Sequence, residues 1–299
     1  MKVTATDYLG RRWRCAACGQ ARSVPTRWVE VAEGVLAHLP DTIPADATPL
    51  VVADEIAWEV AVRTVAHLLQ SACPSVRTVV LPIALHATDK TAEFLMERLS
   101  TDITTALAVG SGAVNDVVKW GATQRAVPYI TVPTAASVNG YTSPIAALTV
   151  DGVKGTLPCH PPIGVLAEPR TVASAPLAMT AAGYADLDWQ VAHRLWDEPY
   201  CPLPRRLIAF ADAWSLDHLR KLAASGQKAV AELLLALIAA GIGMTIAGSS
   251  APSSGGEHLI SHWLDIQADR RGRSPALRWA AGWRRNACGV GALRTLAGD

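Results

Sequence analysis

The sequence lacks a strong charge imbalance, and it lacks any basic run with interleaved aromatic residues. Its 299 residues carry a formal net charge of +1, which gives no indication of a nucleic-acid or membrane-surface partner. The N-terminal residues MKVTATDYLGRRWRC have no apolar core of the kind found in signal peptides. The most apolar segment, residues 233–244, is too short to span a bilayer and is typical of a buried helix. We therefore expect a cytoplasmic protein without membrane insertion.

A second pair of metal-ligating cysteines is also absent. Cys15 and Cys18 are separated by two alanines, a spacing that occurs in half of many zinc sites. No other cysteine pair or Cys/His pair at zinc-finger spacing follows in the chain. The sequence therefore favours a pair of ordinary thiols in an N-terminal loop or hairpin.

Apolar runs alternate with helical patterns through the first part of the chain. Hydrophobic residues make up 50% and charged residues 18% of the sequence, which is a globular composition. Strands are expected at residues 27–31, 49–53, 77–82, 106–109 and 129–132. Such alternation predicts crossover units on a parallel sheet. We predict an α/β, Rossmann-like parallel-sheet domain at 1–169 and an all-α domain at 170–299, with substrate in the cleft between them.

A glycine turn follows the fourth of these strands. Gly110, Ser111 and Gly112 separate it from a helical pattern at 113–124. Glycines at this point allow close backbone approach, and the helix start attracts negative charge, as in dinucleotide-binding folds. Asn115 occupies the place of the third glycine of G-x-G-x-x-G, and glycine turns often hold no ligand, so the motif alone leaves nucleotide binding open. We expect these residues and Asp116 to line the pyrophosphate and the nearby nicotinamide.

A histidine pair stands in the second half of the chain. His258 and His262 are four residues apart, which places them on one face of a helix. Pairs at this spacing bind metals when a carboxylate joins them from elsewhere. They also occur as surface or core histidines at the start of a helix, and the pair by itself leaves both interpretations open.

Five motifs in order carry a family resemblance. They are GSGAVNDVVKW, VPTAASVNGYTSPIAAL, DGVKGTLP, APLAMTAAGYADL and GSSAPSSGGEHLISH. Together they resemble the sn-glycerol-1-phosphate dehydrogenase family, which belongs with the glycerol dehydrogenases, the iron-type alcohol dehydrogenases and the dehydroquinate synthases. The match runs from about residue 12 to residue 265.

The resemblance implies a dehydroquinate synthase-like fold and an enzyme of phospholipid metabolism. The implied reaction is NADH- or NADPH-dependent reduction of dihydroxyacetone phosphate, a small phosphorylated ketone, to sn-glycerol 1-phosphate. A catalytic Zn²⁺ would be held by Asp186 and His258, with His262 as a catalytic residue beside it. Such a metal polarises the ketone oxygen while hydride arrives from the nicotinamide.

The resemblance also assigns the loop after residue 133. Thr134, Ser137 and Ser143 would contact the cofactor, and Asn139 would act on the substrate. Asn139 stands where the family has aspartate, so the hydrogen-bonding shape is kept while the charge is lost.

Two charged residues, Asp54 and Lys154, complete the expected site, and a third, Lys119, is expected to lie outside it. Asp54 could accept a bond from a ribose hydroxyl, which mildly favours NADH, but such a carboxylate is as often a turn residue. Lys154 is the better candidate for a substrate or cofactor phosphate. Lys119, on the helix after the glycine turn, is expected to be solvated or lightly paired.

The last part of the sequence departs from the family pattern. Gln190 and Ala251 replace a lysine and an arginine, and no histidine follows His262 where the family has its third metal ligand. The third ligand would be His262 itself, a carboxylate such as Asp265 or Asp269, or nothing, which predicts weak zinc binding and low turnover.

The composition after residue 275, rich in Arg, Trp, Gly and Ala, predicts a truncated, altered or frameshifted C-terminus. Two alternatives to an active dehydrogenase therefore stay open. They are a degenerate nucleotide-binding relative and a dehydroquinate synthase-like, metal-dependent cyclase. A homo-oligomer is compatible with all of them.

Overall fold

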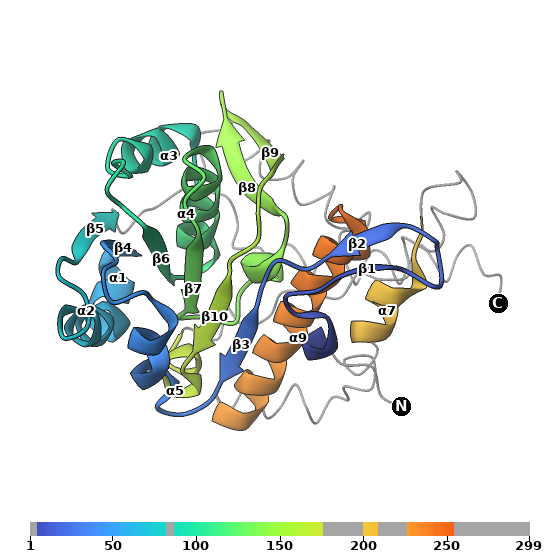
Figure 1. Cartoon of the computed structure of the whole chain (residues 1–299), viewed down its shortest axis with the longest axis horizontal. Helices are drawn as coiled ribbons and strands as arrows, with labels where there is room; N and C mark the ends of the chain where they lie inside the picture. Colours follow the sequence, from blue (N-terminus) through green and yellow to red (C-terminus); the bar gives the residue numbers. More distant parts are fainter. Residues whose placement is uncertain (1–4, 82–86, 176–199, 209–225, 254–299) are drawn as a thin grey trace, which may run out of the picture.

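The computed structural model describes residues 5–81, 87–175, 200–208 and 226–253. A parallel six-stranded sheet forms its centre (Figure 1). In spatial order its strands are β3 (Trp28–Val31), β10 (Gly164–Ala167), β7 (Tyr129–Pro133), β6 (Thr105–Gly110), β4 (Pro49–Asp54) and β5 (Arg77–Leu81). The central strands are buried along almost their whole length, as their continuous apolar sequences require. The predicted Rossmann-like α/β architecture is confirmed.

The order of the strands reverses between β4 and β6. From β4 the chain moves outward to β5 and then returns to the other side of β4 as β6. In open parallel sheets ligands bind outside the carboxyl ends of the strands at such a point. Asp54 ends β4 and Gly110 ends β6, so both lie at this edge.

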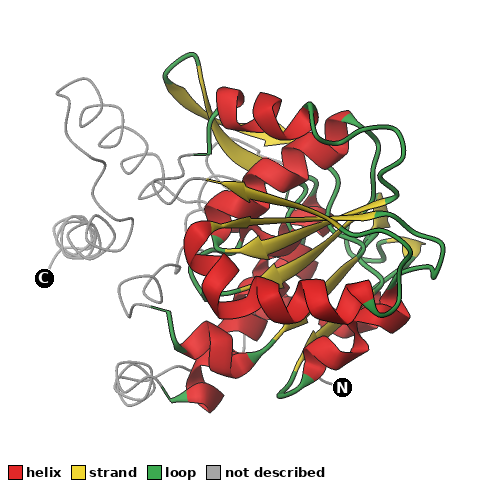
Figure 2. Ribbon diagram, turned by 90° about the vertical axis from the view of Figure 1, so that its left-hand side faces the viewer, coloured by secondary structure: helices red, strands yellow, loops and turns green. Residues whose placement is uncertain are grey.

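Helices cover both faces of the sheet (Figure 2). Alternate side chains of β4 enter different cores, with Val51 and Ala53 on one side and Leu50 and Val52 on the other. The first face is covered by η2 (Val35–Thr42), α1 (Glu55–Ala57), η3 (Trp58–Val62) and α2 (Arg63–Gln70). The second is covered by α3 (Asp89–Met96) and α4 (Gly112–Gln124).

Two antiparallel hairpins stand apart from this sheet. After η1 (Ala5–Tyr8), β1 (Arg12–Arg14) pairs with β2 (Ala21–Ser23) and carries the cysteine pair in its loop. The second hairpin, β8 (Ile145–Val150) with β9 (Val153–Pro158), was not expected from the sequence. Asp151 and Gly152 form its tip with positive φ angles of 50° and 75°.

The described elements after residue 168 are all helical. They are α5 (Pro169–Ala173), α7 (Pro202–Ile208), α9 (Gln227–Ala247) and η7 (Ala251–Ser253). This agrees with the change in character seen in the sequence, although the division into domains at 169/170 stays a prediction. Asp186, His258 and His262 lie outside the described residues.

Helix α9 is longer than the sequence predicts. Its 21 residues are long and apolar enough to cross a membrane, whereas the expected helix was too short. However, 72% of its most apolar window is buried inside the protein, where it packs against α5, α7 and the N-terminal hairpin. Core helices have the same length and composition, and the packing favours that interpretation.

Candidate functional site

The glycine turn joins β6 to α4 at the carboxyl edge of the sheet. A Cβ atom on Gly110 would lie 2.8 Å from the Cβ of Val114, and one on Gly112 would lie 2.7 Å from the Cγ1 of Val138. Both contacts are closer than real Cβ atoms allow, so packing alone requires glycine at these positions. The space over Gly112 is therefore occupied by Val138 of the predicted substrate loop. Ser111 is the N-cap residue of α4 between the two glycines.

Asn115 supports the interior of the site. It is 1% exposed, its Oδ1 accepts a bond of 2.9 Å from the Thr131 hydroxyl, and its Nδ2 donates to the Gly140 carbonyl at 3.5 Å. The side chain thus joins α4 to β7 and to the loop. Direct contact with a pyrophosphate stays a prediction for Asn115, as it does for Asp116.

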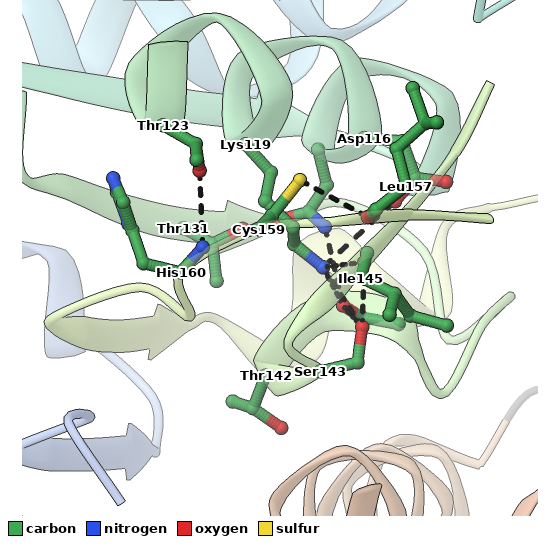
Figure 3. Close-up of polar contacts among 12 residues, drawn as sticks. Asp116, Lys119, Thr123, Thr131, Thr142, Ser143, Ile145, Leu157, Cys159 and His160 are labelled. Atoms are coloured by element: carbon green, nitrogen blue, oxygen red, sulfur yellow. Dashed lines mark hydrogen bonds and ion pairs between the residues drawn. The ribbon is translucent and has the colours of Figure 1, made fainter. Parts of the chain in front are cut away.

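Lys119 is fully buried, and the prediction of a solvated or lightly paired side chain is wrong. Figure 3 shows its side chain directed from α4 toward Ser143 and Ile145. Its Nζ donates to the Gly140 carbonyl, to the Ser143 hydroxyl at 3.0 Å and to the Ile145 carbonyl at 2.9 Å. The sequence pattern of α4 does not show this, because the acceptors come from a loop more than 20 residues later.

Burial and nearby negative groups have opposite effects on the pKa of Lys119. Burial lowers the pKa of Lys119, while the negative charges of the Asp116 carboxylate and of an ionised Cys159 oppose this. The Asp116 Oδ1 lies 4.0 Å from Nζ and offsets part of the charge. Burial raises the pKa of Cys159 to about 11, and the Lys119 charge lowers it in part. A cation held beneath the loop makes this edge of the sheet more attractive to anions.

The loop from Thr134 to Ser143 is held from the other side by α9. It contains the short helix η4 (Gly140–Thr142). The Thr142 hydroxyl donates to the Ile238 carbonyl at 2.8 Å, and the Thr245 hydroxyl donates to the Thr142 carbonyl at 2.8 Å. Gly241 permits this approach, because a Cβ there would lie 2.6 Å from the Asn139 carbonyl oxygen and would collide with Thr142.

The predicted loop residues occupy different positions in this arrangement. Ser143 is fully buried beside Lys119, and the hydroxyl oxygen of Ser137 is also buried. The backbone amide of Thr134 donates to the Gly110 carbonyl at 3.1 Å, which joins the loop to the glycine turn. Asn139 is half-buried and directly precedes η4. The structure therefore brings the glycine turn and this loop together.

The described surroundings of Asp54 and Lys154 are backbone and strand residues that are close to them in the sequence. The Asp54 Oδ1 accepts a bond of 2.7 Å from the Ala57 amide and thereby caps α1. Lys154 lies opposite Thr149 near the tip of the β8–β9 hairpin. That tip adjoins the start of α3, where the Asp151 amide donates to Asp89. Their contacts with cofactor and substrate stay predictions.

At three positions the sequence does not indicate the contacts that the structure shows. Lys119 and Gly241 contact the loop, and Thr131 bonds to Asn115 beneath it, yet in the sequence each has the pattern of an ordinary helix or strand residue. Gly241 offered the strongest signal, since a glycine within a long helical pattern weakens the helix unless close packing requires it. Nothing in the local sequence of Lys119 or Thr131 indicates their partners.

Packing at the glycine turn makes a testable prediction. Gly112→Ala is expected to displace Val138 and to weaken nucleotide binding, with a loss of about 1–3 kcal/mol in the free energy of unfolding. The double variant Gly112→Ala/Val138→Ala should recover that stability, because it removes the atoms that collide. Thermal unfolding and NADH titration measure the two effects.

Gly155→Ala is the matched control, since a Cβ there meets nothing within 4 Å. Equal stabilities of Gly112→Ala with and without Val138→Ala would contradict the packing explanation. Nucleotide affinity that stays low in the stable double variant would instead show that Gly112 is needed for close approach of the cofactor.

The chain is similar to known proteins of one enzyme family. Residues 30–176 match the family model described as iron-containing alcohol dehydrogenase. The glycerol-1-phosphate dehydrogenase (NAD(P)+) of Methanosarcina mazei is 32% identical over 282 residues, which cover 90% of this chain and 76% of that protein. Enzymes with the same name from Bacillus velezensis and Geobacillus thermodenitrificans are 32% and 38% identical, over 78% and 60% of this chain. The chain spans only 62% and 46% of their lengths.

Solved structures share the fold. An iron-containing alcohol dehydrogenase from Thermotoga maritima superposes with a TM-score of 0.65 at 18% identity, covering 83% of this chain and 74% of that one. Glycerol dehydrogenase from Schizosaccharomyces pombe gives a TM-score of 0.60 at 15% identity, covering 79% and 64%. The predicted fold, an α/β sheet domain followed by helices, is confirmed.

Proposed function

Because the chain belongs to the glycerol-1-phosphate dehydrogenase family, we propose that it reduces dihydroxyacetone phosphate to sn-glycerol 1-phosphate with NADH or NADPH. One structural observation carries the proposal. The loop of residues 134–143 lies against the start of α4 at the strand-order reversal, and Lys119 and α9 fix it from two sides. A fixed loop beside a helix start suits a nucleotide and a small substrate held side by side.

The residues of the chain have distinct roles in this proposal. The first turn of α4 binds the pyrophosphate, because its backbone amides carry partial positive charge. Asn139 orients the substrate through its amide, and the buried Lys119 favours the phosphate electrostatically without touching it. Packing of Val138 and Tyr141 excludes water from the base of the loop, since Tyr141 is fully buried and donates to the Ala135 carbonyl at 2.6 Å.

A metal completes the proposed site. Asp186 and His258 would hold it, with His262 beside it, and all three lie outside the described residues. The donor set of one carboxylate and imidazole nitrogens suits Zn²⁺ among other divalent metals. When bound, such an ion polarises the ketone oxygen. The sequence offers few ligands, so we expect weak binding at this site and a reaction that depends on added metal.

Kinetics with the full chain test the proposal. NADH and NADPH oxidation is measured with dihydroxyacetone phosphate, with and without added Zn²⁺, and the product is resolved by chiral analysis. We expect metal-dependent turnover that yields the 1-phosphate enantiomer. Binding of nucleotide without turnover, even with metal, would support a degenerate relative, and a cyclised product would support the synthase-like alternative.

Asn139 provides a variant that tests its role without changing the core. Asn139→Ala should lower kcat by roughly tenfold or more, which corresponds to about 1.4 kcal/mol of transition-state stabilisation. Asn139→Asp restores the residue type of the family and should retain turnover. Thermal unfolding of both variants separates a loss of stability from a loss of turnover. Equal kcat values for Asn139→Ala and the unaltered chain would contradict the assignment.

A further inference from the structure

Three cysteine sulfurs meet between the N-terminal hairpin and the helices. Cys15 and Cys18 come from the loop of the β1–β2 hairpin, and Cys201 directly precedes α7. The three Sγ atoms all lie within 4.8 Å of one another. Cys201 is 186 residues from Cys15 in the chain, so no sequence spacing reveals the cluster. Figure 1 shows β1 and β2 beside α9 and α7, where this contact occurs.

The hairpin loop has the backbone geometry that points two cysteines toward one centre. The Cys15 amide donates to the Gln20 carbonyl at 2.8 Å, and the Gly19 amide donates to the Cys15 carbonyl at 2.8 Å. Gly19 adopts a φ of 68°, which glycine permits directly after the second cysteine. The loop is therefore closed on itself, and both of its sulfurs lie within 4.8 Å of the Cys201 sulfur.

The separation of the sulfurs fits a metal better than a disulfide. The Cys15 and Cys201 sulfurs are 3.7 Å apart. Zinc–sulfur bonds of about 2.3 Å at tetrahedral angles place two sulfurs about 3.8 Å apart, whereas a disulfide requires about 2.05 Å. None of the described cysteines forms a disulfide.

Arg22 supplies charge and orientation to the cluster. Its Nη2 donates to the Cys18 sulfur at 3.4 Å, and its Nη1 donates to the Ala247 carbonyl at the end of α9, at 3.1 Å. The guanidinium thus places a positive charge beside the sulfurs, and a bound metal ion would displace their protons. Three thiolates with Zn²⁺ leave one negative charge, which the guanidinium offsets.

We propose that Cys15, Cys18 and Cys201 bind a structural Zn²⁺ ion that joins the N-terminal hairpin to α7 and α9. Three thiolates are a soft ligand set that selects zinc over magnesium or calcium. A water molecule or one further residue completes the tetrahedron. The cluster shares no ligand with Asp186 and His258, the oxygen and nitrogen ligands of the proposed reaction.

Cobalt substitution distinguishes the two sites. The full chain, stripped of metal and loaded with Co²⁺ under reducing conditions, should show intense near-ultraviolet sulfur-to-cobalt charge-transfer absorption. Carboxylate and imidazole ligands do not give this absorption. Cys15→Ser, Cys18→Ser and Cys201→Ser should each lose most of it. Cys73→Ser is the matched control, because Cys73 is a buried thiol in a different core, and it should retain the absorption.

A measurement on the unaltered chain covers the case in which a variant fails to fold. Zn²⁺ should protect Cys15, Cys18 and Cys201 from iodoacetamide, as read by mass spectrometry, and a chelator should remove that protection. Three results would each overturn the proposal. They are the absence of charge-transfer absorption, identical alkylation with and without Zn²⁺, and a Cys15–Cys201 disulfide in chain purified with Zn²⁺ present.

Discussion

Lys119→Met is expected to lower the free energy of unfolding by about 2–4 kcal/mol and to abolish most turnover. The substitution removes the donor that the Gly140 and Ile145 carbonyls and the Ser143 hydroxyl share. The Ser143 hydroxyl can still donate to either carbonyl, so each loss should stay below the penalty of about 1–3 kcal/mol for a buried acceptor left with no partner. Methionine also removes a buried charge, whose lowered pKa shows that it is itself unfavourable. The net loss should therefore be smaller than the sum of the lost bonds.

The pH dependence of stability provides a second readout for Lys119. Its pKa is lowered in the folded chain, so the unfolded chain binds more protons between that value and the ordinary lysine value of 10.5. The contribution of Lys119 to stability should therefore rise as the pH rises through this window. The unaltered chain should gain stability relative to Lys119→Met across this range, and denaturant unfolding at several alkaline pH values measures it.

Lys90→Met is the control for both measurements, because Lys90 is exposed in the first turn of α3. It should leave stability, the pH profile and turnover close to those of the unaltered chain. If Lys119→Met behaved in the same way, Lys119 would not be holding the loop.

Gly241→Ala is expected to be destabilising although alanine favours helices. The new methyl group would lie 2.6 Å from the Asn139 carbonyl oxygen and would collide with the Thr142 hydroxyl. Overpacking of this kind lowers the free energy of unfolding by about 1–3 kcal/mol. The loop must move away from α9, so KM for dihydroxyacetone phosphate should rise. Thermal unfolding and steady-state kinetics measure the two effects.

Gly243→Ala on the same helix is the matched control. Its added Cβ meets the side chain of Pro204 at 3.3 Å, a contact that a small adjustment relieves. Helix propensity then favours alanine by up to about 1 kcal/mol. Thr142→Ala should restore Gly241→Ala only in part, because the Asn139 carbonyl cannot be trimmed. Equal stabilities of Gly241→Ala and Gly243→Ala would contradict close packing of α9 on the loop.

The sheet could be predicted from the sequence because strands that are buried on both faces have continuous apolar sequences. The runs at 49–53, 106–109 and 129–132 are continuous and apolar, and each became a buried strand. The helix predicted at 56–70 is present but includes the π-helical turn η3 at Trp58–Val62. Such a turn depends on packing rather than on periodicity. The β8–β9 hairpin was missed for a related reason, since its strands are only half-buried.

The site was predictable where a motif is local and not where partners are distant. The glycine turn and the loop at 134–143 are each a single continuous segment of the sequence, and the structure brings the two segments together. The environment of Lys119 depends on the carbonyls of Gly140 and Ile145, which a helical pattern cannot reveal. Cys201 lies 186 residues after Cys15 in the chain, so their contact could not be predicted from the sequence for the same reason.

The edge strand β3 has a consequence for how the chain folds during synthesis. Within the described sheet β3 pairs with β10, and Trp28 lies against Gly164 in register. After β3 has been synthesised, some 130 further residues must therefore leave the ribosome before it can pair with β10. Closing so long a loop is slow. Until then the edge of β3 is open to chaperones and to pairing with other chains. Pulse-labelling hydrogen exchange on stalled nascent chains should show β3 unprotected until residues 164–167 have emerged.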